Sequence, residues 1–266
     1  MIFMLTSLFF EAKPYIDMYR LKKIPAPGGI QIFEGDNRRL AVSGPGPVNA
    51  AAAAAYMLTR YAALRTDTFA NIGAAGSAAF HAGDIVLCHK IVNTFTGKAL
   101  YPEMLYKHPF HEGALGSVGQ PASKSDYALA DMEGAFAYEA AQTFLPSSQI
   151  QCIKVISDNL SPGSVTREGL EKLMYETAGA IGGWLESIAG ADKPADIFSD
   201  GETRLMELIS ENLHMTFAMR QKFWQACGRA KIRDLNITEV LSGYSGNIAK
   251  DKKEGKAAFI SLINIL

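Results

Sequence analysis

A run of β-branched residues followed at once by polar ones is the feature that most limits how this chain can fold. The run is Ile153-Lys154-Val155-Ile156, and Ser157 and Asp158 come directly after it. Its length and β-branching are typical of a buried parallel strand. Open α/β sheets bind ligands beyond the carboxyl ends of such strands, so Asp158 is the first candidate for chemistry. An aspartate that only caps the next element would give the same pattern.

A second carboxylate lies at the other end of the same helix-and-strand segment. The sequence Asp131-Met132-Glu133-Gly134 precedes a stretch rich in alanine, and Glu133 is predicted to lie in the first turn of that helix. The helix dipole favours a charged side chain there, so we expect Glu133 to be ionised. Two such carboxylates suit different tasks, one holding a polar substrate and one moving a proton. A glutamate that merely decorates a helix start is the alternative.

Composition narrows the class of protein. The chain has 266 residues, 48% of them hydrophobic, which supports a sizeable core and argues against disorder. Its 26 basic and 27 acidic residues give no electrostatic signature of nucleic-acid or membrane binding. Three widely spaced cysteines fit a reducing compartment, and no cysteine or histidine spacing suggests a metal site. The apolar start, Met1 to Phe10, is expected to be a core strand rather than a signal sequence, which predicts a cytoplasmic protein.

Strand and helix signals alternate along the first 190 residues. A helix is predicted to begin at Glu11, which therefore projects from a strand-to-helix junction. Runs at 30–33 and 40–43 predict a hairpin. A buried strand is predicted at 68–72, ending in the turn Gly73-Ala74-Ala75-Gly76, where glycines would let a substrate approach the backbone. The alternation predicts an α/β domain.

Four motifs in this order resemble the nucleoside phosphorylase superfamily: Ser43-Gly-Pro-Gly-Pro-Val-Asn49, Asn71-Ile-Gly-Ala-Ala-Gly76, Asp131-Met-Glu-Gly134 and Val155-Ile-Ser-Asp158. Together they are more specific than any one alone. The closest likeness is to the nucleosidase branch, the methylthioadenosine/S-adenosylhomocysteine nucleosidases and the futalosine hydrolases. It spans about residues 1–190. It implies one domain with a central mixed sheet flanked by helices, a small-molecule nucleoside substrate, no cofactor and a homodimer.

The resemblance also implies a role for each matching residue. Asp158 would protonate or hydrogen-bond the departing purine-type base, and Glu11 would take a proton from the attacking water. A shift of one residue in the alignment would put Phe10 in place of Glu11 and leave that role empty. Glu133 would hold ribose hydroxyls with Met132 packed on the sugar face. The remaining substrate-binding residues implied by the match are Gly73, Ala74 and Ser157.

The attacking group is water in the leading hypothesis. The phosphorylases place an arginine and a serine where this chain has Asn71 and Ala74, and phosphate would be poorly held without a cation or hydroxyl. Nucleosidases usually keep the serine replaced by Ala74, and Pro47 replaces a polar residue of the family. Two alternatives therefore stay open: a phosphorylase with an unfamiliar phosphate site, and a nucleoside-binding protein without turnover.

A helical extension is predicted for residues 196–266, after a linker at about 189–199. Apolar residues there follow helical spacing. This segment lies outside the resemblance. Its near-balanced charge favours a packing or dimerisation element over a helical module that binds nucleic acid or a partner. The apolar positions that define the spacing are Leu205, Leu208, Ile209 and Leu213.

Overall fold

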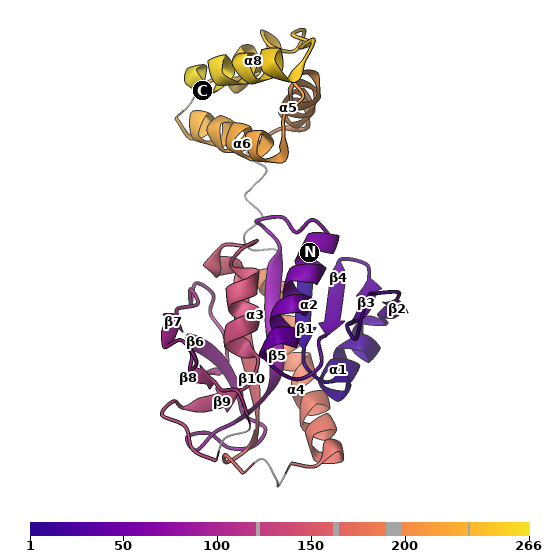
Figure 1. The fold of residues 1–266 in the computed structure, drawn as a ribbon, viewed down its shortest axis with the longest axis vertical. Coiled ribbons are helices and arrows are strands. Elements are labelled where there is room, and N and C mark those ends of the chain that lie inside the picture. The colour runs from indigo at the N-terminus through magenta and orange to yellow at the C-terminus, as the bar shows by residue number, and fades with distance from the viewer. Residues whose placement is uncertain (121–122, 162–164, 190–197, 234) are drawn as a thin grey trace. The chain divides into compact units, whose positions relative to one another are not determined.

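The computed structural model describes residues 1–120, 123–161, 165–189, 198–233 and 235–266. The chain forms two compact units, Met1–Asp192 and Lys193–Leu266 (Figure 1). The predicted linker falls largely outside the described residues. Each unit has its own hydrophobic core and is treated by itself below.

Ten strands of the described residues form one mixed sheet in the first unit. Their order across the sheet is β10-β6-β8-β9-β5-β1-β4-β3-β2, with β7 paired to β6. Because β10 also pairs with β5, the strands β5, β10, β6, β8 and β9 close into a ring. The predicted central mixed sheet is confirmed. The strands are β1 (Ile2–Thr6), β2 (Lys22–Ile24), β3 (Gln31–Gly35), β4 (Arg38–Val42), β5 (Thr68–Gly76), β6 (Ile85–Asn93), β7 (Lys98–Leu100), β8 (His111–Ser117), β9 (Leu129–Asp131) and β10 (Ile150–Asp158).

The strands β4, β1, β5 and β10 run parallel to one another. Their carboxyl ends therefore meet at one edge of the sheet. The predicted buried parallel strand is confirmed in β10, whose last residue is Asp158 and whose first seven residues are all buried. The hairpin prediction is also confirmed, because β3 and β4 pair antiparallel around the turn at Asp36.

The prediction of a turn at Gly73–Gly76 is wrong. Strand β5 continues through Gly76, because β10 pairs with it from Phe69 onward until Asp158 lies opposite Gly76. Glycine and alanine have weak strand propensity, and the pairing with a neighbouring strand overrides it here.

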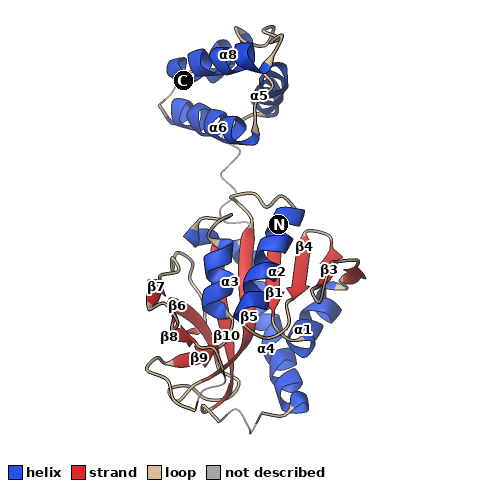
Figure 2. Ribbon diagram, viewed as in Figure 1, coloured by secondary structure: helices blue, strands red, loops and turns tan. Residues whose placement is uncertain are grey.

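Helices cover both faces of the sheet (Figure 2). The helices α2 (Pro47–Arg60) and α3 (Gly134–Ala141) pack on one face, where their alanines form a core with Phe3, Phe69 and Ile156. The helices α1 (Phe9–Tyr19) and α4 (Arg167–Ile188) pack on the opposite face. A short 3-10 helix, η1 (Ser147–Gln149), leads into β10. The central strands β1, β5 and β10 are therefore buried between two helical layers.

The second unit is helical, as predicted. Its helices are α5 (Asp200–Asn212), α6 (Phe217–Ile232), α7 (Ile237–Ser242) and α8 (Lys252–Ile265). Each begins at a residue whose side chain accepts a hydrogen bond from a backbone N–H of the first turn, which satisfies a donor that the helix leaves unpaired. These N-cap residues are Ser199, Thr216, Asn236 and Asp251. The buried side chains of this unit include Met206, Ile209, Phe223, Leu241 and Leu262.

Candidate active site

The carboxyl edge of the parallel strands gathers the residues predicted to do chemistry. Glu11 follows β1 as the third residue of α1, Gly46 follows β4, and Glu133 follows β9. Gly73 and Ala74 lie in the second half of β5, and β10 ends at Asp158. This is the edge at which open α/β sheets place their ligands.

Glu11 is held in place from two sides. Glu11 is buried, with only 2% of the residue exposed. Its Oε2 accepts hydrogen bonds from the backbone N–H of Ser7 at 3.0 Å and of Leu8 at 2.8 Å, and from the Ser7 hydroxyl at 3.1 Å. Its Oε1 accepts one from the Ala74 N–H at 2.9 Å. A Cβ at Gly73 would lie 3.2 Å from that oxygen, so glycine leaves the room that the carboxylate occupies.

Phe10 occupies a different environment from its neighbour. It packs partly buried against the core on the α1 and α4 face, with the guanidinium of Arg167 6.0 Å from the centre of its ring. Of the two residues that the alignment left open, Glu11 is therefore the one that contacts β5.

Glu133 is the N-cap residue of α3 rather than part of its first turn. Its Oε1 accepts a hydrogen bond from the Gly46 N–H at 2.7 Å. Burial, and then the negative charge of Asp131, raise the pKa of Glu133 to about 7, although the Gly46 hydrogen bond and the Lys154 charge oppose them. The helix dipole alone favours the charged form of Glu133, whereas burial raises its pKa, so the group is only partly ionised near neutral pH.

Asp131, two residues before Glu133, forms a buried ion pair with Lys154. The side chains of Lys154 and Asp131 are 2% and 0% exposed, and Nζ lies 2.7 Å from Oδ2. The Lys154 Nζ also donates to Oδ1 of Asn71 at 2.7 Å. Burial is the largest single influence and lowers the pKa of Lys154. The charge of Asp131, the neighbouring Cys152 and the hydrogen bond to Asp131 together outweigh it, so the pKa is raised and the ammonium stays charged.

Asp158 is held by its own loop. Its Oδ2 accepts a hydrogen bond from the Ser157 hydroxyl at 2.6 Å, and its Oδ1 accepts one from the Ser161 N–H at 2.6 Å. A Cβ at Gly76 would lie 3.2 Å from Oδ1. The carboxylate is thus seated against the end of β5, two residues beyond the Ala74 N–H that Glu11 accepts from.

Comparisons with known proteins give a fold and no sequence family. No family model matches the chain, and no curated protein sequence matches it. Among solved structures, the methylthioadenosine/S-adenosylhomocysteine nucleosidase of Neisseria meningitidis matches with a TM-score of 0.60, 18% identity, and coverage of 70% of this chain and 98% of that one. A mutant of the Helicobacter pylori nucleosidase, with 5′-methylthioadenosine in its active site, matches with a TM-score of 0.59 and 19% identity. The match covers 70% of this chain and 98% of that one. Helicobacter pylori futalosine hydrolase matches with a TM-score of 0.54 and 17% identity, over 71% of this chain and 97% of that one.

The chain has the nucleosidase fold. The resemblance inferred from the four motifs is thereby confirmed at the level of the fold. The sequence identities are all below 25%, so these matches establish the fold, and the chemistry depends on the residues of the site.

The nucleosidase fold brings the predicted site residues together in three groups. Glu11 contacts Ala74 and lies against Gly73. Ser157 and Asp158 contact each other beside Gly76. Glu133 contacts Gly46, and the charge of Glu11 contributes to the raised pKa of Glu133, which links the first group to the third. Met132 is half-buried between Asp131 and Glu133.

Two residues of the site were not singled out from the sequence. Asp131 begins one of the four motifs and Lys154 lies in the β-branched run, but neither was assigned a function. The signal was present in the sequence: a lysine inside a β-branched run predicted to be buried requires a charged partner. The identity of that partner depends on which strands meet, and so it appears only in the fold.

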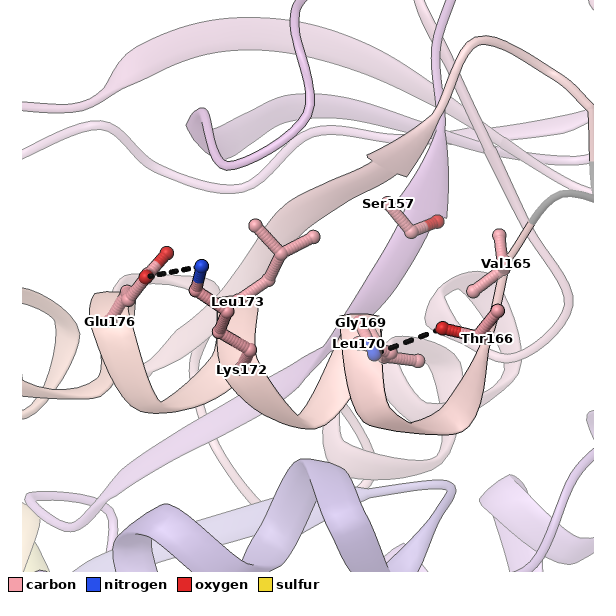
Figure 3. A pocket seen from close by; sticks show the side chains of 8 residues that line it. All are labelled: Ser157, Val165, Thr166, Gly169, Leu170, Lys172, Leu173 and Glu176. Carbon is pink, nitrogen blue, oxygen red and sulfur yellow. Dashed lines mark hydrogen bonds and ion pairs between the residues drawn. The ribbon is translucent and has the colours of Figure 1, made fainter.

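A pocket of about 310 Å³ opens beside Ser157, between the carboxyl end of β10 and the first turns of α4 (Figure 3). Its lining combines the Ser157 hydroxyl with the apolar side chains of Val165, Leu170 and Leu173. Lys172 and Glu176 lie along α4 at its rim, with Nζ 3.8 Å from Oε1. The pocket can accept a largely apolar group beside the Ser157 hydroxyl.

Within the described ranges, no group of three or more histidine, cysteine, aspartate or glutamate side chains is placed to hold a metal ion. In the same part of the chain, the helices are all too short or too polar to cross a lipid bilayer.

Proposed function

We propose that this protein is a nucleosidase, which uses water to cleave the N-glycosidic bond of a purine-type nucleoside related to methylthioadenosine or S-adenosylhomocysteine. One observation carries the proposal: Glu11, Glu133 and Asp158 gather at the carboxyl edge of the sheet, on a fold shared with enzymes named for that reaction. Breaking the bond leaves an electron pair on the base nitrogen and an oxocarbenium-like sugar.

Asp158 would act on the leaving base. It is half-buried at the end of β10, next to Ser157, which lines the pocket. The Ser157 hydroxyl and the Ser161 N–H orient its carboxyl group. A carboxyl group so placed can donate a proton or a hydrogen bond to a ring nitrogen of the base as the electron pair arrives there. This makes the base a better leaving group.

Glu11 would take the proton from the attacking water. The four hydrogen bonds to its carboxylate fix the side chain, and the contact with Ala74 brings it onto β5 near Gly73. The water oxygen bonds to the sugar carbon that the base leaves, and its proton passes to the carboxylate. The same four hydrogen bonds occupy much of the carboxylate, which is the observation that favours the alternative of a nucleoside-binding protein without turnover.

Glu133 would hold the ribose hydroxyls, with Met132 against the sugar face. The carboxyl group is fixed by the Gly46 N–H, and with a pKa raised to about 7 it can accept or donate a hydrogen bond near neutral pH. A half-buried carboxyl group with one oxygen engaged keeps the other for a substrate hydroxyl.

Hydrolysis is preferred to phosphorolysis. Phosphate binding calls for cations or hydroxyl donors, but the amide oxygen of Asn71 accepts from Lys154, and Ala74 offers only a methyl group and an N–H already bound to Glu11. A phosphorylase with a different phosphate site remains the alternative enzyme.

The proposal includes a homodimer in the cytoplasm, as the resemblance and the composition imply. Three free cysteines, all buried, are compatible with a reducing compartment. Light scattering coupled to size-exclusion chromatography will report the oligomeric state, and a monomeric mass at micromolar concentration would contradict the dimer.

A chromatographic assay for released base tests the function. The substrates are methylthioadenosine, S-adenosylhomocysteine, futalosine, adenosine, inosine and guanosine, each with and without phosphate. We expect release without phosphate that Asp158→Asn lowers by about 100-fold or more. Asp36→Asn, which changes an exposed carboxylate at the opposite edge of the sheet, is the matched control and should leave the rate unchanged. Phosphate-dependent release would favour the phosphorylase, and ligand binding without release would favour the binding protein.

A further inference from the structure

Lys154 has no part in the proposed chemistry, yet it is buried in the middle of the sheet. Its neighbours along β10, Ile153 and Val155, are fully buried, and the lysine side chain is 2% exposed. Burying an ammonium group is costly unless a partner of opposite charge lies within hydrogen-bond distance. Because an apolar residue would suit the position better on stability alone, the charge calls for an explanation.

The contacts of Lys154 lead to the start of α3. Its partner Asp131 uses both carboxylate oxygens: Oδ2 also accepts from the Gly134 N–H at 2.7 Å, and Oδ1 accepts from the Ser117 hydroxyl at 2.5 Å. The Ser117 hydroxyl oxygen in turn accepts from the Ala135 N–H at 2.8 Å. The first two N–H groups of α3 are therefore bound by this network, and Glu133 is the residue immediately before them.

We propose that Lys154 is a positioning residue, which pairs with Asp131 and thereby fixes the turn that presents the Glu133 carboxylate to the substrate. The inference rests on the proposed function, in which Glu133 holds the ribose. Lys154 acts through Asp131 and touches no substrate. Asn71 supports the same arrangement from β5, because its Oδ1 accepts the second hydrogen bond of the ammonium.

The charges around Glu133 explain why a cation is needed at this place. Asp131 and Glu11 are the negative groups that act on Glu133, and Lys154 and the Gly46 N–H are the groups that oppose them. Without Lys154, Asp131 would be a buried carboxylate with no counter-ion, lying two residues from another carboxylate. One of the two would then have to bind a proton or move, and either change disturbs the site.

The kinetic test is a double-mutant cycle on base release. We expect Lys154→Met to lower kcat/KM about 10- to 100-fold, mainly through KM, and Lys154→Arg to restore most of the loss because it keeps the charge. Asp131→Asn should cost a similar factor. Because Lys154 acts through Asp131, adding Lys154→Met to Asp131→Asn should cost little more. The double variant buries no unpaired charge, so it keeps the test valid if Lys154→Met alone fails to fold.

The matched control is Lys13→Met. Lys13 forms an ion pair of the same length, 2.7 Å, with Glu171, but its side chain is 42% exposed. This variant should leave kcat/KM unchanged. Losses that multiply in the double variant, or a loss in Lys154→Met that Arg does not relieve, would overturn the proposal.

A second measurement is independent of activity, so that failure of the proposed function can be told apart from failure of this inference. The carboxyl carbon of Glu133 is followed by ¹³C NMR across pH, with Glu133→Gln identifying its signal. Lys154→Met should move the titration midpoint, and Lys13→Met should not. If the unmodified protein releases no base, the proposed function fails while this experiment still decides the inference. An unchanged midpoint in folded Lys154→Met would overturn it.

Discussion

The backbone N–H of Gly46 donates a hydrogen bond to Oε1 of Glu133 at 2.7 Å, and this bond joins the turn after β4 to the turn after β9. Gly46 has a φ of +100°, a backbone conformation that residues with a Cβ rarely adopt. The positive φ therefore requires glycine at position 46 of the Gly44-Pro45-Gly46-Pro47 turn, where the backbone N–H reaches Glu133.

Replacing that glycine should damage both stability and substrate binding. Gly46→Ala forces a side chain into a strained conformation, which we expect to cost about 1 kcal/mol or more of the free energy of unfolding. It should also raise KM, because the N–H moves away from Glu133. Denaturant titration and steady-state kinetics measure the two effects. Gly97→Ala is the control: Gly97 has a φ of +72° with open space around its Cβ position, and its replacement should lower stability without changing KM.

The raised pKa of Glu133 predicts how stability depends on pH. Its folded-state pKa of about 7 lies above the ordinary value of 4.5, so between these values the folded protein holds a proton that the unfolded chain has released. The contribution to stability is complete below pH 4.5 and is lost as the pH rises through 7. Glu133→Gln keeps an acceptor for Gly46 and carries no charge. We expect it to gain on the order of 1 kcal/mol over the unmodified protein at pH 8 and almost nothing at pH 4.

Thermal unfolding of both proteins at pH 4, 6 and 8 measures this difference. A Tm difference that is the same at all three pH values would contradict the raised pKa. The kinetic counterpart is a kcat/KM that changes with an apparent pKa near 7 in the unmodified protein and loses that dependence in Glu133→Gln.

The space at Gly73 is a second requirement of the site. Gly73→Ala would place a Cβ 3.2 Å from Oε1 of Glu11, closer than ordinary contact, and so push the carboxylate away from Ala74. We expect kcat to fall about 10-fold or more, since a displaced group of this kind loses its catalytic contribution. Base release under saturating substrate measures it.

Gly179→Ala is the matched control for Gly73→Ala. Gly179 lies inside α4 with nothing within 4 Å of its Cβ position. Alanine there should stabilise the protein by about 0.5–1 kcal/mol, through its better helix propensity, and leave kcat unchanged. Equal losses of kcat in both variants would show that the role given to the Gly73 position is wrong.

Features that depend on neighbouring residues could be predicted from the sequence. Features that depend on residues far apart in the chain could not. Strand β10 and the place of Asp158 follow from a β-branched run and the polar residues after it, which are both local signals. The length of β5 was underestimated because Gly73 and Gly76 suggest a turn, whereas pairing with β10 holds them in a strand.

The protonation of Glu133 could not be predicted for a similar reason. Its motif position indicated a helix start, and the dipole argument followed from that alone. The burial of its carboxyl group, the charge of Asp131 and the hydrogen bond to Gly46 all come from elements brought together by the fold. The same holds for the pairing of Lys154 with Asp131.

The most direct test of the central claim is to identify the atom that replaces the base on the sugar. The reaction is run in ¹⁸O-labelled water with phosphate present, using whichever nucleoside releases base, and the sugar product is analysed by mass spectrometry. We predict free sugar carrying one ¹⁸O atom at the carbon that bore the base, formed about 100-fold or more slowly by Asp158→Asn. A sugar phosphate without the label would contradict hydrolysis by water and establish a phosphorylase instead.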